Sequence, residues 1–108
     1  MNKIKFIIFG VALFVASIIN AQPKPEQKAK KFADEMTKVL QLNKEESQAI
    51  YDIQLARFKE NQEIEKNYAN DPETKKEKLK ELGNKVFNET KKVIGEDRQK
   101  KWKEYKSN

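Results

Sequence analysis

The sequence predicts an all-α fold, with four helices in a thin helical-hairpin arrangement after a cleaved N-terminal signal peptide. After residue 21 the chain has only two glycines and three prolines and is rich in Lys, Glu, Gln and Ala, a composition that favours helices with few interruptions. Apolar residues recur there at spacings of three and four, as they do on one helix face. The remaining 87 residues suffice for one small domain with little core.

Residues 1–21 have the layout of a secretory signal peptide. Lys3 and Lys5 precede a run of 14 apolar and small residues over 6–19, which is shorter than the ~20 residues that a membrane-spanning helix needs. We therefore expect cleavage between Ala21 and Gln22, with an uncleaved membrane anchor as the alternative. This predicts a signal peptide over 1–21, a single α-helical domain over 22–108, and an exported protein, periplasmic or secreted.

The first two predicted helices cover 26–40 and 44–69. The linker before the first contains Pro23 and Pro25, which disfavour helix in the residues preceding them. Asn43 is a good N-cap for the second helix, and Glu46 three residues later completes a capping box. The second helix has a wide apolar surface in its first half. Its second half, 59–67, is mostly polar, so we expect that half to project into solvent.

The last two predicted helices cover 72–93 and 96–105. Asp71 caps the third helix, and Pro72 suits its first position. Gly83 interrupts the sequence of this helix, and we expect another helix to pack closely there. The fourth helix carries Trp102 and Tyr105. The apolar stripe of the third helix consists of Leu79, Leu82, Val86 and Val93, with Phe87 and Thr90 alongside.

The composition excludes several kinds of chemistry. The chain has no Cys and no His, so it lacks disulfides, a thiol nucleophile, the commonest metal ligands and the usual general base. It also lacks a Gly-rich phosphate loop and an EF-hand loop. We therefore expect no enzyme activity, no catalytic residue, no metal and no cofactor.

The charge is basic and uneven. Two of the 23 basic residues and none of the 17 acidic residues fall in residues 1–21, so the rest of the chain has a net charge of +4. Residues 72–108 carry 12 basic and 7 acidic side chains. This half suits acidic partners or anionic lipid headgroups, or is simply a solvated helix face. Because the chain is expected to be exported, nucleic acid is not an expected partner.

Two helix junctions share a pattern. In each, an apolar residue directly precedes a capping or turn residue, and a second apolar residue, the anchor, follows eight residues after the first apolar residue. The anchors are Ile50 and Trp102. The pattern residues are Leu42, Asn43 and Glu46 at the first junction, and Ile94, Gly95 and Arg98 at the second.

This pattern resembles the LTxxQ motif of the Spy/CpxP family of small periplasmic helical proteins, in which the motif occurs twice. The first junction keeps the Leu and replaces the Thr and the Gln, and the second keeps only the apolar residue and the turn. The resemblance implies a thin, curved helical protein that forms a cradle-like homodimer. Such proteins bind unfolded clients without ATP or restrain an envelope-stress sensor.

The resemblance also implies a concave surface with apolar patches ringed by lysines. The candidate residues for this client surface are Phe32, Met36, Tyr51, Leu55 and Phe58; the alternative is that these five form the ordinary core. The predicted function is thus an exported chaperone or stress adaptor for unfolded or envelope proteins. One alternative is a structural helical protein that docks a fixed envelope partner. Another is a protein held at the membrane by residues 1–21 and its basic half.

Overall fold

The computed structural model describes residues 23–108; the predicted signal peptide and its cleavage site at Ala21 and Gln22 lie outside the described residues. These residues form four helices and no strand: α2 (Pro25–Leu40), α3 (Lys44–Asn67), α4 (Pro72–Ile94) and α5 (Glu96–Ser107). The predicted all-α, four-helix fold is confirmed. Each predicted helix end lies within two residues of the observed one.

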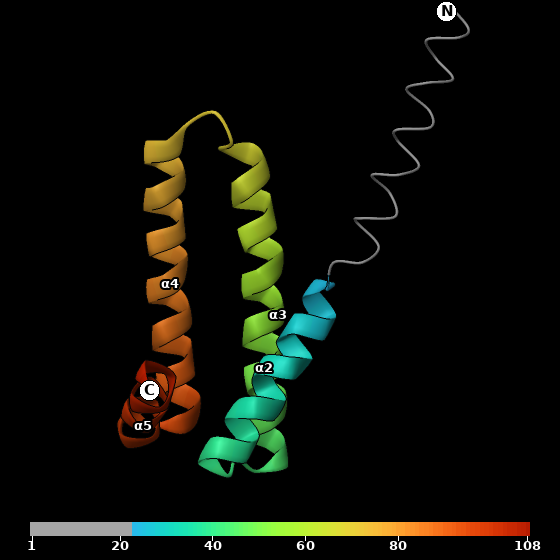
Figure 1. Ribbon diagram of the computed structural model, residues 1–108, viewed down its shortest axis with the longest axis vertical. Helices are drawn as coiled ribbons and strands as arrows, with labels where there is room; N and C mark the ends of the chain where they lie inside the picture. Colours follow the sequence, from blue (N-terminus) through green and yellow to red (C-terminus); the bar gives the residue numbers. More distant parts are fainter. Residues whose placement is uncertain (1–22) are drawn as a thin grey trace, which may run out of the picture.

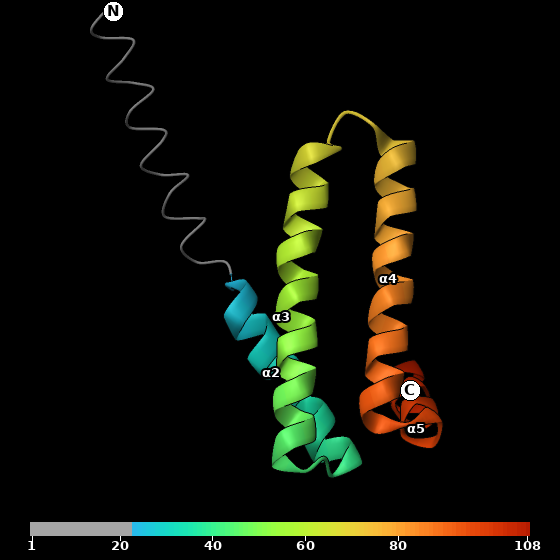
Figure 2. The same ribbon diagram turned by 180° about the vertical axis from the view of Figure 1, so that it is seen from behind.

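The helices α3 and α4 form an antiparallel hairpin, and α2 and α5 cross it near its open end (Figures 1 and 2). Here α2 packs on α3, α5 packs on α4, and α2 and α5 contact each other. The four helices therefore form a closed ring at the open end of the hairpin. The opposite end, at the 68–71 turn, consists of α3 and α4 alone (Figure 1).

Local hydrogen bonds define the starts of α3 and α4. The Asn43 side chain accepts a hydrogen bond from the Glu46 backbone N–H at 2.8 Å, and Glu46 Oε1 accepts one from the Asn43 N–H at 3.0 Å. At α4, Asp71 accepts from the backbone N–H and the hydroxyl of Thr74, at 3.2 and 2.7 Å. Both predicted caps are confirmed. Each satisfies backbone N–H groups that the first helical turn leaves without partners.

Most of the buried side chains of residues 23–108 fall in two clusters. The larger cluster holds the ring together and consists of Ala33, Met36, Leu40, Leu42, Ile50 and Ile94. The smaller one lies between α3 and α4 and consists of Ile64, Leu82 and Val86. Ile64 is only 7% exposed, so the expectation that 59–67 projects into solvent is wrong at this residue. Through Ile64, this otherwise polar stretch packs against Leu82 and Val86 of α4.

The surroundings of Gly83 differ from the prediction. A Cβ atom added at this glycine would meet no atom within 4 Å, so no second helix packs closely there. Phe87, one turn further along α4, is 54% exposed. This side of α4 is therefore an open face. Across residues 23–108, no helix has both the length and the hydropathy that membrane crossing requires.

Candidate functional site

The two motif-like turns meet in the fold. Leu42 and Ile94 are buried in the same cluster. The Arg98 guanidinium and the Glu46 carboxylate form a bidentate ion pair, in which Nη1 donates to Oε1 at 3.1 Å and Nη2 donates to Oε2. Each turn was recognisable in the sequence, but their pairing was not predicted. The opposite charges at the last position of each pattern are the signal that could have indicated it.

The Glu46–Arg98 pair joins three helix ends. Glu46 belongs to the first turn of α3, and Arg98 belongs to the first turn of α5. Arg98 Nε also donates to the Ile94 carbonyl oxygen at 2.8 Å, at the end of α4. The hydrogen bond from Arg98 lowers the pKa of Glu46, with a further contribution from the Asn43 N–H. The same contact raises the pKa of Arg98, so both groups are charged at neutral pH.

Where the four helices meet, they line an open groove of ≈ 550 Å³, which we call the aromatic groove. Residues from all four helices line it. The apolar lining residues are Phe32 and Met36 from α2, Val86 and Phe87 from α4, and Trp102 from α5. Gln54 and Thr90, both buried, add two neutral polar side chains.

Trp102 is the centre of an aromatic and polar contact between α5 and α2. Its ring centroid lies 5.4 Å from that of Phe32 and 5.4 Å from that of Tyr105. The Tyr105 hydroxyl donates to Glu35 at 3.1 Å, and Lys106 Nζ lies 3.3 Å from the same carboxylate. The Tyr105 hydrogen bond lowers the pKa of Glu35, and Glu35 raises the pKa of Tyr105. These contacts hold α5 in place although none of its residues is buried.

The charge lining the aromatic groove has one sign. Arg57, Lys103 and Lys106 line it, and none of the described residues that line it is a carboxylate. Arg57 Nη1 donates to Gln54 Oε1 at 3.1 Å, and its guanidinium lies 5.5 Å from the Phe58 ring. Lys106 Nζ lies 5.2 Å from the Trp102 ring. The groove therefore combines aromatic faces with positive charge, which suits a ligand that is apolar and anionic.

The structure separates the five candidate client-surface residues. Phe32 is half-buried and lines the aromatic groove. Met36 also borders it but is only 1% exposed, which corrects its assignment to an accessible surface. Tyr51 is half-buried and lines a different cavity, while Leu55 and Phe58 are half-buried on α3. Phe87, Trp102 and Arg57 were not predicted as site residues, because the lining of the groove depends on how four separate helices meet.

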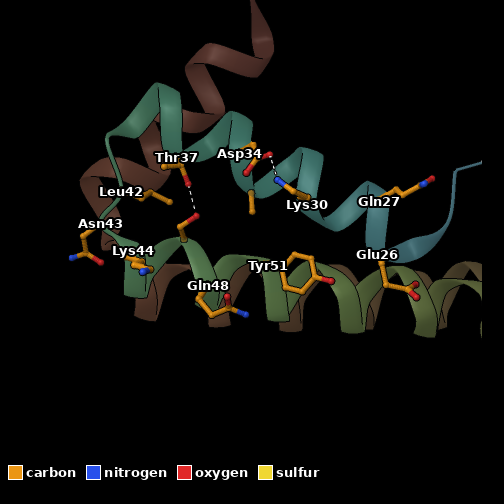
Figure 3. Close-up of a pocket in the computed structure, with 12 residues that line it drawn as sticks. Glu26, Gln27, Lys30, Asp34, Thr37, Leu42, Asn43, Lys44, Gln48 and Tyr51 are labelled. Carbon is orange, nitrogen blue, oxygen red and sulfur yellow. Dashed lines mark hydrogen bonds and ion pairs between the residues drawn. The ribbon is translucent and has the colours of Figure 1, made fainter.

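The second cavity, of ≈ 590 Å³, lies between α2 and the first half of α3 (Figure 3). Its lining includes the Lys30–Asp34 ion pair at 2.9 Å, and the Thr37 hydroxyl donates to Ser47 Oγ at 2.8 Å (Figure 3). Carboxylates and lysines line it together, so it lacks the single-sign charge of the aromatic groove. We therefore take the aromatic groove as the candidate functional site.

Comparison with known proteins gives no match: no family model, no curated protein and no solved structure is significantly similar to this chain. Within residues 23–108 no group of three or more acidic side chains is arranged to hold a metal ion. Within residues 23–108, the fold and the groove define the class: a small all-α domain of four helices with a cationic aromatic groove. The resemblance to the Spy/CpxP family stays a prediction.

Proposed function

We propose that this chain is an exported helical binding protein that resembles the ATP-independent chaperones and envelope-stress adaptors of the Spy/CpxP family. The aromatic groove carries this proposal. It presents Phe32, Phe87 and Trp102 beside three cationic side chains and no carboxylate from residues 23–108. An accessible apolar surface of this kind marks an interaction site in a small protein.

In this proposal the groove and its rim accept apolar and aromatic side chains from an unfolded client. Phe87 is the most accessible contact because more than half of its surface is exposed. The cations speed the encounter with acidic clients, and this acceleration weakens as salt rises. A client that folds buries its own apolar side chains and leaves, so the cycle requires no ATP.

The export part of the proposal rests on residues 1–21, whose layout directs the chain to the periplasm, where the mature form acts as a cradle-like homodimer. Lysines outnumber acidic side chains along α4 and α5, and this excess of positive charge favours acidic clients. No nucleic acid, cofactor or stable membrane span enters this account.

The test is suppression of client aggregation without ATP, measured by light scattering with the protein purified after its natural processing. Phe87→Ser should weaken suppression and leave the melting temperature within about 2 °C, because exposed substitutions usually change stability by less than ~0.5 kcal/mol. Tyr51→Ser removes an aromatic ring outside the groove and should weaken suppression less. If the wild-type protein gives no suppression in molar excess, the chaperone proposal is wrong, and the alternative of a protein that docks one fixed envelope partner is favoured.

A further inference from the structure

The aromatic groove has the size of a small-molecule site. Its volume of ≈ 550 Å³ falls in the range of about 300–1,000 Å³ that is typical of small-molecule sites. Among its buried lining residues, the polar side chains are Gln54 and Thr90, and Gln54 Oε1 already accepts a hydrogen bond from Arg57. The buried part of the lining therefore offers only these two neutral polar side chains from residues 23–108, too few to pair the N–H and C=O groups of an extended peptide.

This shortage favours an alkyl chain over a peptide backbone in the depth of the groove. Every residue of an extended peptide brings an N–H and a C=O group, and each buried group costs free energy unless it finds a partner. An unbranched hydrocarbon brings no such groups. It packs against the accessible side chains of Phe32, Phe87 and Trp102, which line the groove, and brings no polar group of its own that needs a partner.

The cationic side chains that line the groove indicate that the other end of the ligand is negatively charged. Arg57 on α3 and Lys103 on α5 both line the groove, and within residues 23–108 neither takes part in an ion pair. Lys106, the third cation, shares Glu35 with Tyr105. A ligand carboxylate beside Lys103 and Arg57 would gain charge-assisted hydrogen bonds that the chain itself does not supply.

We propose that the aromatic groove binds one single-chain anionic amphiphile of the fatty-acid class. The alkyl chain lies in the groove against Phe32, Phe87 and Trp102, and the carboxylate lies at Lys103 and Arg57. This inference does not rest on the chaperone proposal, because it requires only the groove. If both hold, the amphiphile competes with clients for the same aromatic side chains.

Titration calorimetry, with Trp102 fluorescence in parallel, tests this site. Trp102 is the sole tryptophan of the chain, so its emission reports on the groove directly. The naturally processed protein is titrated with decanoate and with decanol, each below its micelle or solubility limit. Decanoate should saturate at one molecule per chain and bind more tightly than decanol. From octanoate to dodecanoate, Kd should fall about three- to fourfold for each added methylene, as ~0.8 kcal/mol per buried CH₂ requires.

A pair of charge reversals on α5 provides the matched comparison. Lys103→Glu places a carboxylate in the groove lining, while Lys101→Glu makes the same change of net charge at an exposed residue that is not among the lining residues. Lys103→Glu should raise the Kd of decanoate by about threefold or more, and Lys101→Glu by less than about twofold. Circular dichroism confirms that both variants are folded.

Four results would overturn the inference: no saturable decanoate binding, decanol binding as tightly as decanoate, equal effects of the two charge reversals, or a short acidic aromatic peptide that binds the groove more tightly than dodecanoate. The last result would assign the groove to polypeptides. Failure of amphiphile binding leaves the aggregation assay unaffected, so the two proposals fail separately.

Discussion

Arg98 shows how much of this fold depends on a single side chain. Its guanidinium bonds to Glu46 at the start of α3 and to the Ile94 carbonyl oxygen at the end of α4. The carbonyl contact satisfies an acceptor that a helix end leaves without an intrahelical partner. The bidentate contact fixes the orientation of α5 relative to α3. The two motif-like turns thus act together as one junction.

The Glu46–Arg98 pair predicts a pH dependence of stability. The pKa of Glu46 is lowered in the folded chain, so its stabilising effect is complete above the ordinary value of about 4.3 and is lost as pH falls through the lowered folded value. Glu46→Gln should therefore lower the melting temperature at pH 7. Between pH 5 and pH 2, the melting temperature of this variant should fall less than that of the wild type. Thermal unfolding monitored by circular dichroism measures both.

Glu35 and Asp71 also have lowered pKa values, and both remain in the Glu46→Gln variant. The difference between the two melting curves therefore isolates Glu46. Parallel acid dependences of the wild type and the variant would contradict this assignment.

The caps give a second prediction at the residue scale. Asn43→Ala and Asp71→Ala should each lower the free energy of unfolding by about 0.5–2 kcal/mol, because each leaves backbone N–H groups without a side-chain partner. Urea denaturation measures the change. Asn70→Ala is the control, since Asn70 is exposed in the same turn as Asp71 and should change the midpoint little. Unchanged midpoints for both cap variants would show that these side chains do not define the helix starts.

At the element scale, the position of α5 depends on its contacts with neighbouring helices. It has no buried residue and directly follows Gly95, whose φ of +86° lies in a region that favours glycine. Its attachment to α2 rests on Trp102 against Phe32 and on Tyr105 and Lys106 at Glu35. Elements with few buried contacts open more readily than the rest of a fold, so α5 should be the first helix to detach.

Removing the Trp102 ring tests whether α5 detaches before the other helices. Trp102→Ala should speed amide hydrogen exchange across α5, while the part of the hairpin around Ile64 and Leu82 keeps its protection. The loss of stability should fall below the ~3–5 kcal/mol of a fully buried aromatic, because Trp102 is only half-buried. Tyr105→Phe keeps the stacked ring and loses only the hydrogen bond to Glu35, so it should change exchange less. Uniform acceleration across all four helices would contradict a separable α5.

The helix ends were predictable because their signals are local. Asn43, Asp71 and Pro72 each determine a helix start within one turn of themselves, so no knowledge of the tertiary fold is needed. The burial of Ile64 was not predictable in this way, since its packing partners Leu82 and Val86 come from the next helix. The prediction of close helix packing at Gly83 was wrong for the same reason. A glycine in a helix permits close packing, but whether a second helix lies beside it depends on the tertiary fold.

At the scale of the whole molecule, the four helices of residues 23–108 leave a groove where they meet. Few residues are fully buried, as expected for a chain this small. The aromatic groove was beyond the sequence analysis because its lining comes from helices far apart in the chain. Only Phe32 and Met36 among the candidate surface residues border it, and Met36 lies in the core. The repeated turn pattern was visible in the sequence, but the ion pair between its copies was not.

The pattern of residues 1–21 predicts that the protein is exported. Mass spectrometry of the protein isolated from its native envelope should find a chain that begins at Gln22, in its free or cyclised form. The reason is the short apolar run between Lys5 and Ala21, which suits a cleaved signal peptide better than an anchor. An intact Met1 in the membrane fraction would instead support the anchored form.

The central claim is that clients bind at the aromatic groove, and site-specific photo-crosslinking tests it most directly. A benzophenone amino acid replaces Phe87 in one variant and Tyr51 in another, and each variant is illuminated with an unfolded client in the absence of ATP. We expect strong crosslinking from position 87, which lines the groove, and weak crosslinking from position 51, which lines the cavity between α2 and α3. Equal or stronger crosslinking from position 51, or none from position 87, would contradict the account.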